Sequence, residues 1–459
     1  MKKRRILSVT AAILLSLSCI FTLSSCVFSF KKAPQTDGSG SGGDETVNGG
    51  IGDNADEQSE PELPVLPDLP ASEGLELETR TDENGNGYAA VIGVGECEDR
   101  VIVIPSEHEG LQVSEIADKA FYTYRFYEEV IIPGTVKRIG KDAFSGSRML
   151  EKVTFCNGTE IIDDGAFSFC AKLTDIKLPG SVTYLGENVF SACTKLESIK
   201  LSDNLEYIGS SILNGTAYYK NSDNWSGDLL YYGNYLIGAN KEIVGVVTVA
   251  EGTKLIASRV FSSMDRLSEV ILPDTVEILC NGVFNFNVGL VEMSLPDSIK
   301  KMGKSQFWGC PNMISVKLPE GYDTITEGMF YNCSSLCEVT IPSSVTHIEN
   351  HAFYGSGIKE ITFPQNLTVI EFFAFGACKS LDKVNFNASL KSVGHDAFRN
   401  CRRLSEITLP SSITEIKTDA LPDTLTDIYY SGTKEQWEQI EIGNQFLSFE
   451  SKVTVHFSE

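Results

Sequence analysis

The twelve cysteines are the residues of this chain whose type and number could support redox or metal chemistry. Six of them occupy one repeated position, three residues after a phenylalanine: Cys170, Cys193, Cys310, Cys333, Cys378 and Cys401. Four others lie elsewhere in the repeats: Cys97, Cys156, Cys280 and Cys337. Zinc sites and redox pairs need close spacings such as C-x-x-C, which this sequence lacks. Cysteines in neighbouring repeats could approach each other, but their side chains would point the same way, which is poor disulfide geometry. We therefore expect free, buried thiols that pack as small apolar residues.

Two other motifs carry residue types that bind metals or act in catalysis. His347 and His351 form H-x-x-x-H, but the glutamate is at position 349 rather than next to the first histidine, so we interpret both as exposed bystanders. Residues 82–87 read D-E-N-G-N-G, like the start of a calcium loop, but position 12 of such a loop would be Gly93 instead of glutamate. A tight hairpin before a strand over 88–94 is the better interpretation. The chain contains no P-loop and no G-x-S-x-G motif, so we expect no enzyme, no cofactor and no metal site.

These residues belong to a repeat that phenylalanine marks along most of the chain. Its two runs are Phe121, Phe144, Phe167 and Phe190, then Phe261, Phe284, Phe307, Phe330, Phe353, Phe375 and Phe398. The spacing is 23 residues, with one spacing of 22, and Leu213 and Leu421 substitute for phenylalanine to give thirteen positions. A fixed period of this length predicts a solenoid, in which each repeat buries its apolar face against its neighbours.

Each repeat follows the template L-x-x-V-x-L-P-x-x-V-x-x-I-x-x-x-A-F-x-x-C. The alternating L-x-x-V-x-L segment predicts a short strand that proline ends, and the same phase in every repeat makes these strands parallel. V-x-x-I predicts a second, shorter extended segment, and A-F-x-x-C a single helical turn. The expected fold is an α/β-type repeat solenoid of about 13 rungs, roughly 60 Å long.

This pattern resembles the BspA-type leucine-rich repeat, over about residues 85–457. The resemblance implies a right-handed solenoid on a bacterial surface or secreted protein, with a role in adhesion or binding. It implies no enzymatic activity, and it does not supply a ligand.

The N-terminus predicts export and anchoring. Residues 2–5 are basic, an apolar run covers 6–21, and residues 23–26 read L-S-S-C, which resembles the bacterial lipobox. The resemblance implies cleavage after residue 25 and lipidation of Cys26, which would anchor the protein outside the cell membrane. The alternative is an ordinary signal peptide in which this cysteine is incidental.

Residues 26–79 predict an acidic tether, because 33–79 contain no Lys or Arg and are rich in Gly, Ser, Asp and Pro. The solenoid would then occupy 80–459. The net charge is −24, or −28 without the four basic signal residues. This charge argues against nucleic acid as a partner, and against membrane contact other than through the lipid. A basic or cation-bridged partner is one interpretation, and simple solubility is the other.

Two segments depart from the period. The first, about 214–245, contains crowded aromatic residues that could bind a protein or a glycan: Tyr218, Tyr219, Trp225, Tyr231 and Tyr232. The alternative is that they pack on the solenoid, with 229–237 as a hairpin. The second, about 422–459, predicts a C-terminal cap. There Thr433 and Gln436 form a capping box, Trp437 and Ile440 point inward, and a strand over 452–457 closes the fold.

The outward positions of the first strand in each repeat are small, polar and of mixed charge. They include Glu151, Lys152, Thr154, Thr174, Asp175, Lys177, Glu292, Ser294, Glu338, Thr340, Lys359, Glu360, Thr362, Glu406 and Thr408. Such a face favours weak, multivalent contacts. The sequence therefore predicts a monomeric, non-catalytic surface protein that binds an extracellular protein or glycan. A structural or assembly role in the bacterial envelope is the alternative.

Overall fold

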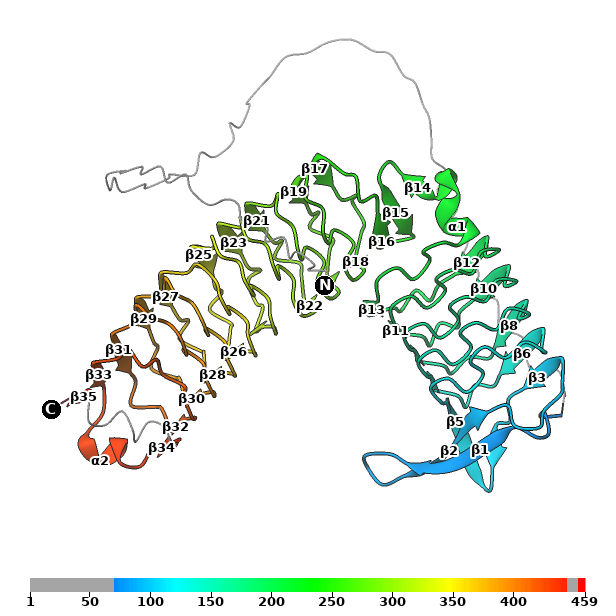
Figure 1. Cartoon of the computed structure of the whole chain (residues 1–459), viewed down its shortest axis with the longest axis horizontal. Helices are drawn as coiled ribbons and strands as arrows, with labels where there is room; N and C mark the ends of the chain where they lie inside the picture. Colours follow the sequence, from blue (N-terminus) through cyan, green and yellow to red (C-terminus); the bar gives the residue numbers. More distant parts are fainter. Residues whose placement is uncertain (1–69, 444–452, 459) are drawn as a thin grey trace, which may run out of the picture. The chain divides into compact units, whose positions relative to one another are not determined.

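The computed structural model describes residues 70–443 and 453–458. The predicted export signal, Cys26 and the predicted tether up to residue 69 lie outside the described residues. Residues 70–79, which were also predicted as tether, instead belong to the solenoid: Leu75 is buried in its core, and β1(Glu76–Thr81) pairs with β2(Gly87–Gly93). All described residues belong to one compact unit, Pro61–Glu459, in which the chain coils as a solenoid of about 16 turns (Figure 1). We call the thirteen positions that phenylalanine or leucine marks the ladder. The number of turns exceeds thirteen because the end turns and the interrupted turn lack a ladder residue.

Each turn contributes two short strands, and both sets are parallel from turn to turn, as the template predicts. The first strands are β3(Val101–Val103), β6(Glu129–Ile132), β8(Lys152–Phe155), β10(Asp175–Lys177), β12(Ser198–Lys200), β17(Gly245–Thr248), β19(Leu267–Ile271), β21(Glu292–Ser294), β23(Ser315–Lys317), β25(Glu338–Thr340), β27(Glu360–Thr362), β29(Lys383–Asn385), β31(Glu406–Leu409), β33(Asp427–Tyr430) and β35(Thr454–Phe457). The second strands are β5(Leu111–Ile116), β7(Arg138–Ile139), β9(Ile161–Ile162), β11(Tyr184–Leu185), β13(Tyr207–Ile208), β16(Tyr235–Ala239), β18(Leu255–Ile256), β20(Ile278–Leu279), β22(Lys301–Met302), β24(Thr324–Ile325), β26(His347–Ile348), β28(Val369–Ile370), β30(Ser392–Val393), β32(Glu415–Ile416) and β34(Glu441–Ile442). Equivalent residues pair directly, for example Val316 with Val339, so the repeat period sets the strand register.

The ladder phenylalanines form the centre of the core. All eleven are fully buried, and neighbouring rings stack with centroids 4.8 to 6.0 Å apart. Leu213 and Leu421 occupy the same position and are also buried. The ladder therefore packs each turn against the next, as the fixed period predicts.

The segment around each ladder phenylalanine is two successive tight turns, where a single helical turn was expected. In the Phe307 turn, Trp308 N donates to Ser305 O, and Cys310 N donates to Phe307 O. Residues two before and two after the phenylalanine have positive φ, such as Ser305 at 61° and Asn332 at 56°. This left-handed backbone interrupts a helix and directs the ladder N–H to the next turn, where Phe307 N donates to Met329 O at 2.9 Å.

The six repeated cysteines are free and buried, and they do more than fill space. Each Sγ lies in hydrogen-bond range of the carbonyl of the ladder phenylalanine in the preceding turn, at 3.0 to 3.3 Å. Ser147 and Asn287 at the same position donate to the equivalent carbonyls. In these eight turns the position holds a side chain that can donate a hydrogen bond, and the thiol serves because it has an S–H.

Two caps close the described solenoid. At the N-terminal end, β1(Glu76–Thr81) and β2(Gly87–Gly93) form an antiparallel hairpin, and β2 continues in parallel to β5. The short β4(Glu107–His108) pairs with β5. At the C-terminal end, α2(Lys434–Trp437) begins at the capping box of Thr433 and Gln436, as predicted. Ile440 is buried, and β35 supplies the closing strand within the range expected for it.

The solenoid is interrupted after β13. The chain forms α1(Ala217–Lys220), the 3₁₀ turn η1(Ser222–Asn224), β14(Trp225–Ser226) and β15(Leu229–Tyr232) before β16. β15 and β16 make the expected hairpin, and β16 pairs with β18 in the position of a second strand. The hairpin replaces the double turn that would normally precede the Phe261 turn.

Lys241 occupies the place of that missing turn. Carbonyls next to a ladder phenylalanine normally accept N–H groups from the preceding turn, as Met329 O does. Before Phe261 no such turn exists, and Lys241 Nζ donates instead to the carbonyls of Arg259, Val260 and Ser262 at 3.3, 3.2 and 3.0 Å. Desolvation lowers the pKa of Lys241 to about 8, whereas the three carbonyls favour the charged form.

We call the six repeated cysteines the cysteine column. Two of its thiols, those of Cys310 and Cys333, should be unreactive in the folded protein. Burial raises the pKa of Cys310 to about 12 and that of Cys333 well above its usual value, while Cys337 is exposed. Cys310 should therefore carry about 1000-fold less thiolate than a thiol with the ordinary pKa. We expect it to resist iodoacetamide at pH 8, whereas the exposed Cys337 should react. Peptide mapping by mass spectrometry measures both sites, with the urea-unfolded chain as the control in which all react. Equal labelling of Cys310 and Cys337 in the folded chain would contradict the hydrogen-bonded column.

Replacing Lys241 should destabilise the solenoid at its interruption. Lys241→Met leaves carbonyls without their donor, so the free energy of unfolding should fall by about 1 to 3 kcal/mol. Urea denaturation followed by circular dichroism measures this. The matched control is Lys220→Met, because Lys220 is exposed in the same segment and should change stability by less than about 0.5 kcal/mol. Equal stability of the two variants would show that Lys241 does not replace the missing turn.

Candidate functional site

The aromatic residues predicted as a binding site lie in the interruption. Tyr218, Tyr219, Trp225, Tyr231 and Tyr232 are all half-buried and pack against the core. They come from α1, β14 and β15, so the sequence correctly groups them in the irregular segment. Their burial shows that packing uses much of their surface.

Hydroxyl groups of the hairpin tyrosines accept backbone N–H groups from the turns on either side of the hairpin. Tyr231 Oη accepts from Ala250 N at 3.0 Å, and Tyr235 Oη accepts from Leu205 N at 3.2 Å. Burial raises the pKa of Tyr232 and Tyr235. Trp225 Nε1 likewise donates to Tyr219 O at 2.8 Å. The polar tips of Tyr231, Tyr235 and Trp225 are therefore used inside the protein.

An open pocket of about 740 Å³ adjoins the interruption, and two of the five predicted residues line it. Its lining residues are Tyr219, Lys220, Ser222, Trp225, Gly227, Asn240, Lys241 and Glu242. The Tyr219 and Trp225 rings meet edge to face, with centroids 5.1 Å apart. Aromatic rings beside polar groups form a depression that could receive a sugar or a peptide side chain.

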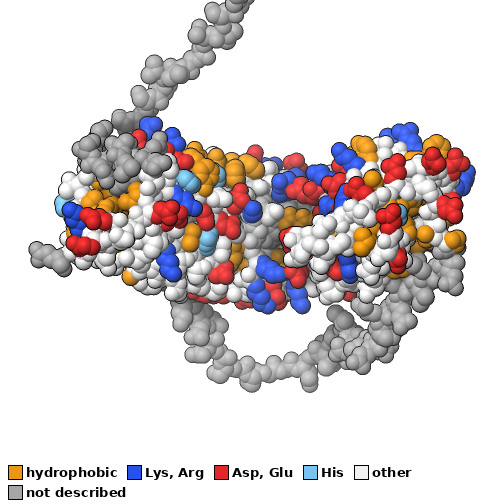
Figure 2. Space-filling model, turned by 90° about the horizontal axis from the view of Figure 1, so that it is seen from below, with side chains coloured by type: hydrophobic (Ala, Val, Ile, Leu, Met, Phe, Trp, Pro, Cys, Tyr) orange, Lys and Arg blue, Asp and Glu red, His pale blue; other side chains and the backbone are white. Residues whose placement is uncertain are grey.

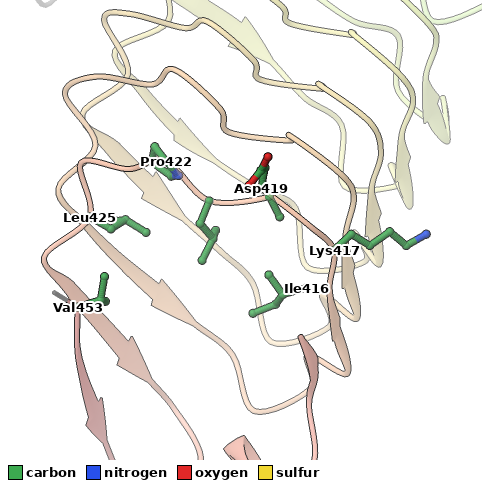
Figure 3. A pocket seen from close by; sticks show the side chains of 8 residues that line it. Ile416, Lys417, Asp419, Pro422, Leu425 and Val453 are labelled. Carbon is green, nitrogen blue, oxygen red and sulfur yellow. The ribbon is translucent and has the colours of Figure 1, made fainter. Parts of the chain in front are cut away.

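A second, much smaller gap lies at the last repeat, beside α2 and β35. It is lined by Ile416, Lys417, Asp419, Ala420, Leu421, Pro422, Leu425 and Val453. Figure 3 shows Ile416 and Leu425 directed toward this gap and Lys417 directed away from it. Its volume of about 10 Å³ holds one water molecule at most. This gap is a packing defect of the end turn and no ligand site.

The two histidines of the H-x-x-x-H motif do not meet. His347 lies on β26, with Nε2 3.2 Å from a carboxylate oxygen of Glu371. His351 stacks on Phe373 at a centroid distance of 5.6 Å, and burial lowers its pKa. Asp82 accepts N–H groups of Asn84 and Asn86 and so closes the β1–β2 hairpin. Within residues 70–443 and 453–458, no three His, Cys, Asp or Glu side chains are placed to hold a metal.

A set of aromatic side chains that sequence reasoning missed runs across five consecutive turns. We call it the aromatic stripe: Phe286, Trp308, Tyr331, Tyr354, Phe372 and Phe373. Trp308 stacks on Tyr331 at 3.9 Å between ring centroids, and Tyr331 stacks on Tyr354 at 4.8 Å. Figure 2 shows hydrophobic side chains gathered beside histidines in the half of the solenoid that holds these turns. The signal in the sequence was an aromatic residue directly after the ladder phenylalanine in three successive repeats.

The first-strand face is exposed and mostly polar, as predicted, but Val246 of β17 and Ile271 of β19 are 55% and 44% exposed on it. Ion pairs cross from turn to turn on this face, such as Lys152 with Glu129 at 2.8 Å and Lys172 with Glu151 at 2.7 Å. Because neighbouring side chains already neutralise these charges, the face offers little for a tight contact. Exposed ion pairs of this kind contribute little to stability either.

The helices among the described residues are too short to cross a membrane. Each of α1 and α2 contains four residues.

Comparison with solved structures finds bacterial leucine-rich repeat proteins. One is a cell surface protein from Faecalibacterium prausnitzii, 21% identical over 82% of this chain and 98% of its own, with a TM-score of 0.30. Another, from Bacteroides ovatus, is 21% identical over 84% and 98%, with a TM-score of 0.35. The pneumococcal vaccine antigen PcpA is 18% identical over 85% and 98%, with a TM-score of 0.32. Curated proteins gave no match.

The sequence model of the BspA type leucine rich repeat region matches in six copies, over residues 114–226, 254–381 and 348–444. These ranges cover more than half of the chain, and they leave out 227–253, which contains the β15–β16 hairpin. The repeats themselves thus carry the match, and the chain belongs to the BspA type leucine-rich repeat family.

Proposed function

We propose that this protein is a non-catalytic binding protein of the bacterial cell surface, which contacts an extracellular protein or glycan in adhesion. One observation carries the proposal: large aromatic side chains of the aromatic stripe remain exposed outside the core. Phe286 is 50% exposed and Phe372 is 38% exposed, at opposite ends of the stripe. Contiguous exposed apolar surface of this kind is typical of interaction sites.

The reactive residues support a non-catalytic role. The column cysteines are buried and hydrogen-bonded, His347 pairs with a carboxylate, and Asp82 closes a hairpin. Each of these groups has a structural partner, so none is left as a nucleophile or base beside a substrate cleft. The leucine-rich repeat solenoid instead supplies an extended surface for binding.

Two other parts of the sequence support a place outside the cell. The lipobox-like residues before Cys26 favour a lipid anchor, and the acidic stretch 26–69 favours a tether that holds the solenoid clear of the membrane. With the net charge of −24, we propose no nucleic-acid partner and no membrane contact beyond the lipid. We also propose that the protein acts as a monomer.

The full chain in detergent should bind at least one class of ligand on an array of matrix proteins, mucins and glycans. Because the first-strand face favours many weak contacts, apparent affinity should be about 100-fold higher on dense spots than on sparse ones. Tyr219→Ala with Trp225→Ala tests the pocket on the same array, and loss of glycan spots alone would assign glycans to it. Absence of binding to every class would reject adhesion. Recovery of one stoichiometric envelope protein by crosslinking on intact cells would then favour the assembly role.

Cys26→Ala should release the protein from the membrane fraction. The variant lacks the thiol that would carry the lipid, so incorporation of a clickable palmitate analogue should fall to background. Cys19→Ala, in the same segment, is the matched control and should label as wild type. Persistent membrane association and labelling of Cys26→Ala would show that this cysteine is not the anchor.

A further inference from the structure

The aromatic stripe differs from the aromatics of the interruption in its unused hydrogen-bonding groups. In the described residues, no hydrogen bond involves Trp308 Nε1 or the hydroxyls of Tyr331 and Tyr354. Trp225 and Tyr231, by contrast, place their polar atoms on backbone partners. Trp and Tyr combine an apolar ring with a polar tip, and both are enriched at interfaces for that reason. The stripe therefore has polar tips available to a partner.

Two rings of the stripe occupy backbone positions that disfavour them. Phe286 and Phe373 have φ of 58° and 52°, in the left-handed region, and His351, which stacks on Phe373, has 56°. The equivalent positions of other turns carry residues such as glycine, asparagine or serine. Bulky side chains are rare in this conformation. Phe286 keeps this conformation although it is 50% exposed, as does Phe169 outside the stripe. What distinguishes the stripe is its run of neighbouring rings in successive turns.

The faces of most rings in the stripe are already covered. Trp308, Tyr331 and Tyr354 cover one another by stacking, at 3.9 and 4.8 Å. Glycines of the adjoining turn leave room for these rings. An added Cβ at Gly328 would lie only 2.6 Å from the Trp308 ring. A Cβ at Gly309 would lie 2.8 Å from the Phe286 ring. Sugars and bases stack on ring faces, so this surface suits them poorly, whereas exposed ring edges suit the aromatic and aliphatic side chains of a protein.

Carboxylates outnumber free cations along the stripe. Glu349 and Glu371 flank it. Glu349 accepts only the backbone N–H of Glu327 among the described contacts, and Glu371 lies 3.2 Å from His347 Nε2. The nearby cations are already paired, Lys304 with Glu327 at 2.6 Å and Arg399 with Asp396 at 2.8 Å. The carboxylates at the edge of the stripe leave this edge negatively charged, so a cationic partner is complementary to it.

We propose that the aromatic stripe is the docking surface for a cationic protein segment that carries aromatic or aliphatic side chains. The inference rests on the proposed binding function and names the surface and the chemistry of its partner. Ring edges and free hydroxyls receive the apolar side chains and polar groups of the segment, and Glu349 and Glu371 receive its Lys or Arg. The Lys304–Glu327 and Arg399–Asp396 pairs lie on either side of these two carboxylates along the solenoid.

The test uses immobilised synthetic 15-residue peptides and the full chain in detergent. The peptides alternate arginine with tyrosine, arginine with leucine, glutamate with tyrosine, or serine with glycine, and chitin and dextran oligosaccharides are printed beside them. We expect both arginine peptides to bind with at least 10-fold higher affinity than the other two. This affinity should fall when salt is added. Tyr331→Ser with Tyr354→Ser should weaken arginine-peptide binding at least 10-fold.

The matched control replaces exposed aromatics at the same repeat positions outside the stripe. Tyr122 and Phe169 are 50% and 57% exposed, so Tyr122→Ser with Phe169→Ser should bind as wild type. Glu349→Gln with Glu371→Gln leaves all rings in place and should weaken arginine peptides about 3- to 10-fold. Unchanged unfolding midpoints in urea show that lost binding is not lost folding.

Several results would overturn the inference. These are wild-type binding by the Tyr331→Ser, Tyr354→Ser variant, no binding of the wild type to any peptide, or binding of an oligosaccharide that this variant abolishes. If the matrix-protein and glycan array finds a ligand that the variant still binds, the proposed function stands and the stripe is not its site. If the wild type binds nothing on either array, both proposals fail.

Discussion

The contact between one turn and the next is the interaction on which the rest of this structure depends. Each ladder phenylalanine stacks on its neighbour, and its N–H donates to the following turn, as Phe330 N does to Ala352 O at 2.7 Å. No turn buries its apolar face alone, so stability comes from neighbour contacts along the stack. Where a turn is missing, another group must supply those contacts, and Lys241 does so.

Position within the repeat decides what a residue does, more than its chemical type. A cysteine three residues after the ladder phenylalanine is a buried hydrogen-bond donor, whereas Cys337 is exposed. A tyrosine in the hairpin supplies its hydroxyl to the backbone, whereas Tyr331 leaves its hydroxyl free for a partner. The first-strand face and the turns differ in the same way. Ion pairs neutralise charges on the first-strand face, whereas ring edges stay exposed on the turns.

Local spacing in the sequence was enough to predict several features. These are the phase of the strands, the second short strand, the capping box at Thr433 and the hairpin of the interruption. The aromatic stripe was not predicted, although Trp308 and Tyr331 directly follow ladder residues. Its recognition required the left-handed backbone of Phe286 and Phe373, which turns these side chains to one edge, and the template suggested a helical turn there. The role of Lys241 depends on the absence of a turn, which no residue type in the sequence marks.

The most direct test of this account compares two neighbouring aromatic residues of one turn. Phe353 is fully buried in the ladder, and Tyr354 belongs to the stripe. The free energy of unfolding in urea should fall by about 3 to 5 kcal/mol for Phe353→Ala. For Tyr354→Ala it should fall by about 1 kcal/mol, the loss of a partly exposed ring contact. Equal losses for the two variants would contradict the account, because they would show that the stripe is held for stability as the ladder is.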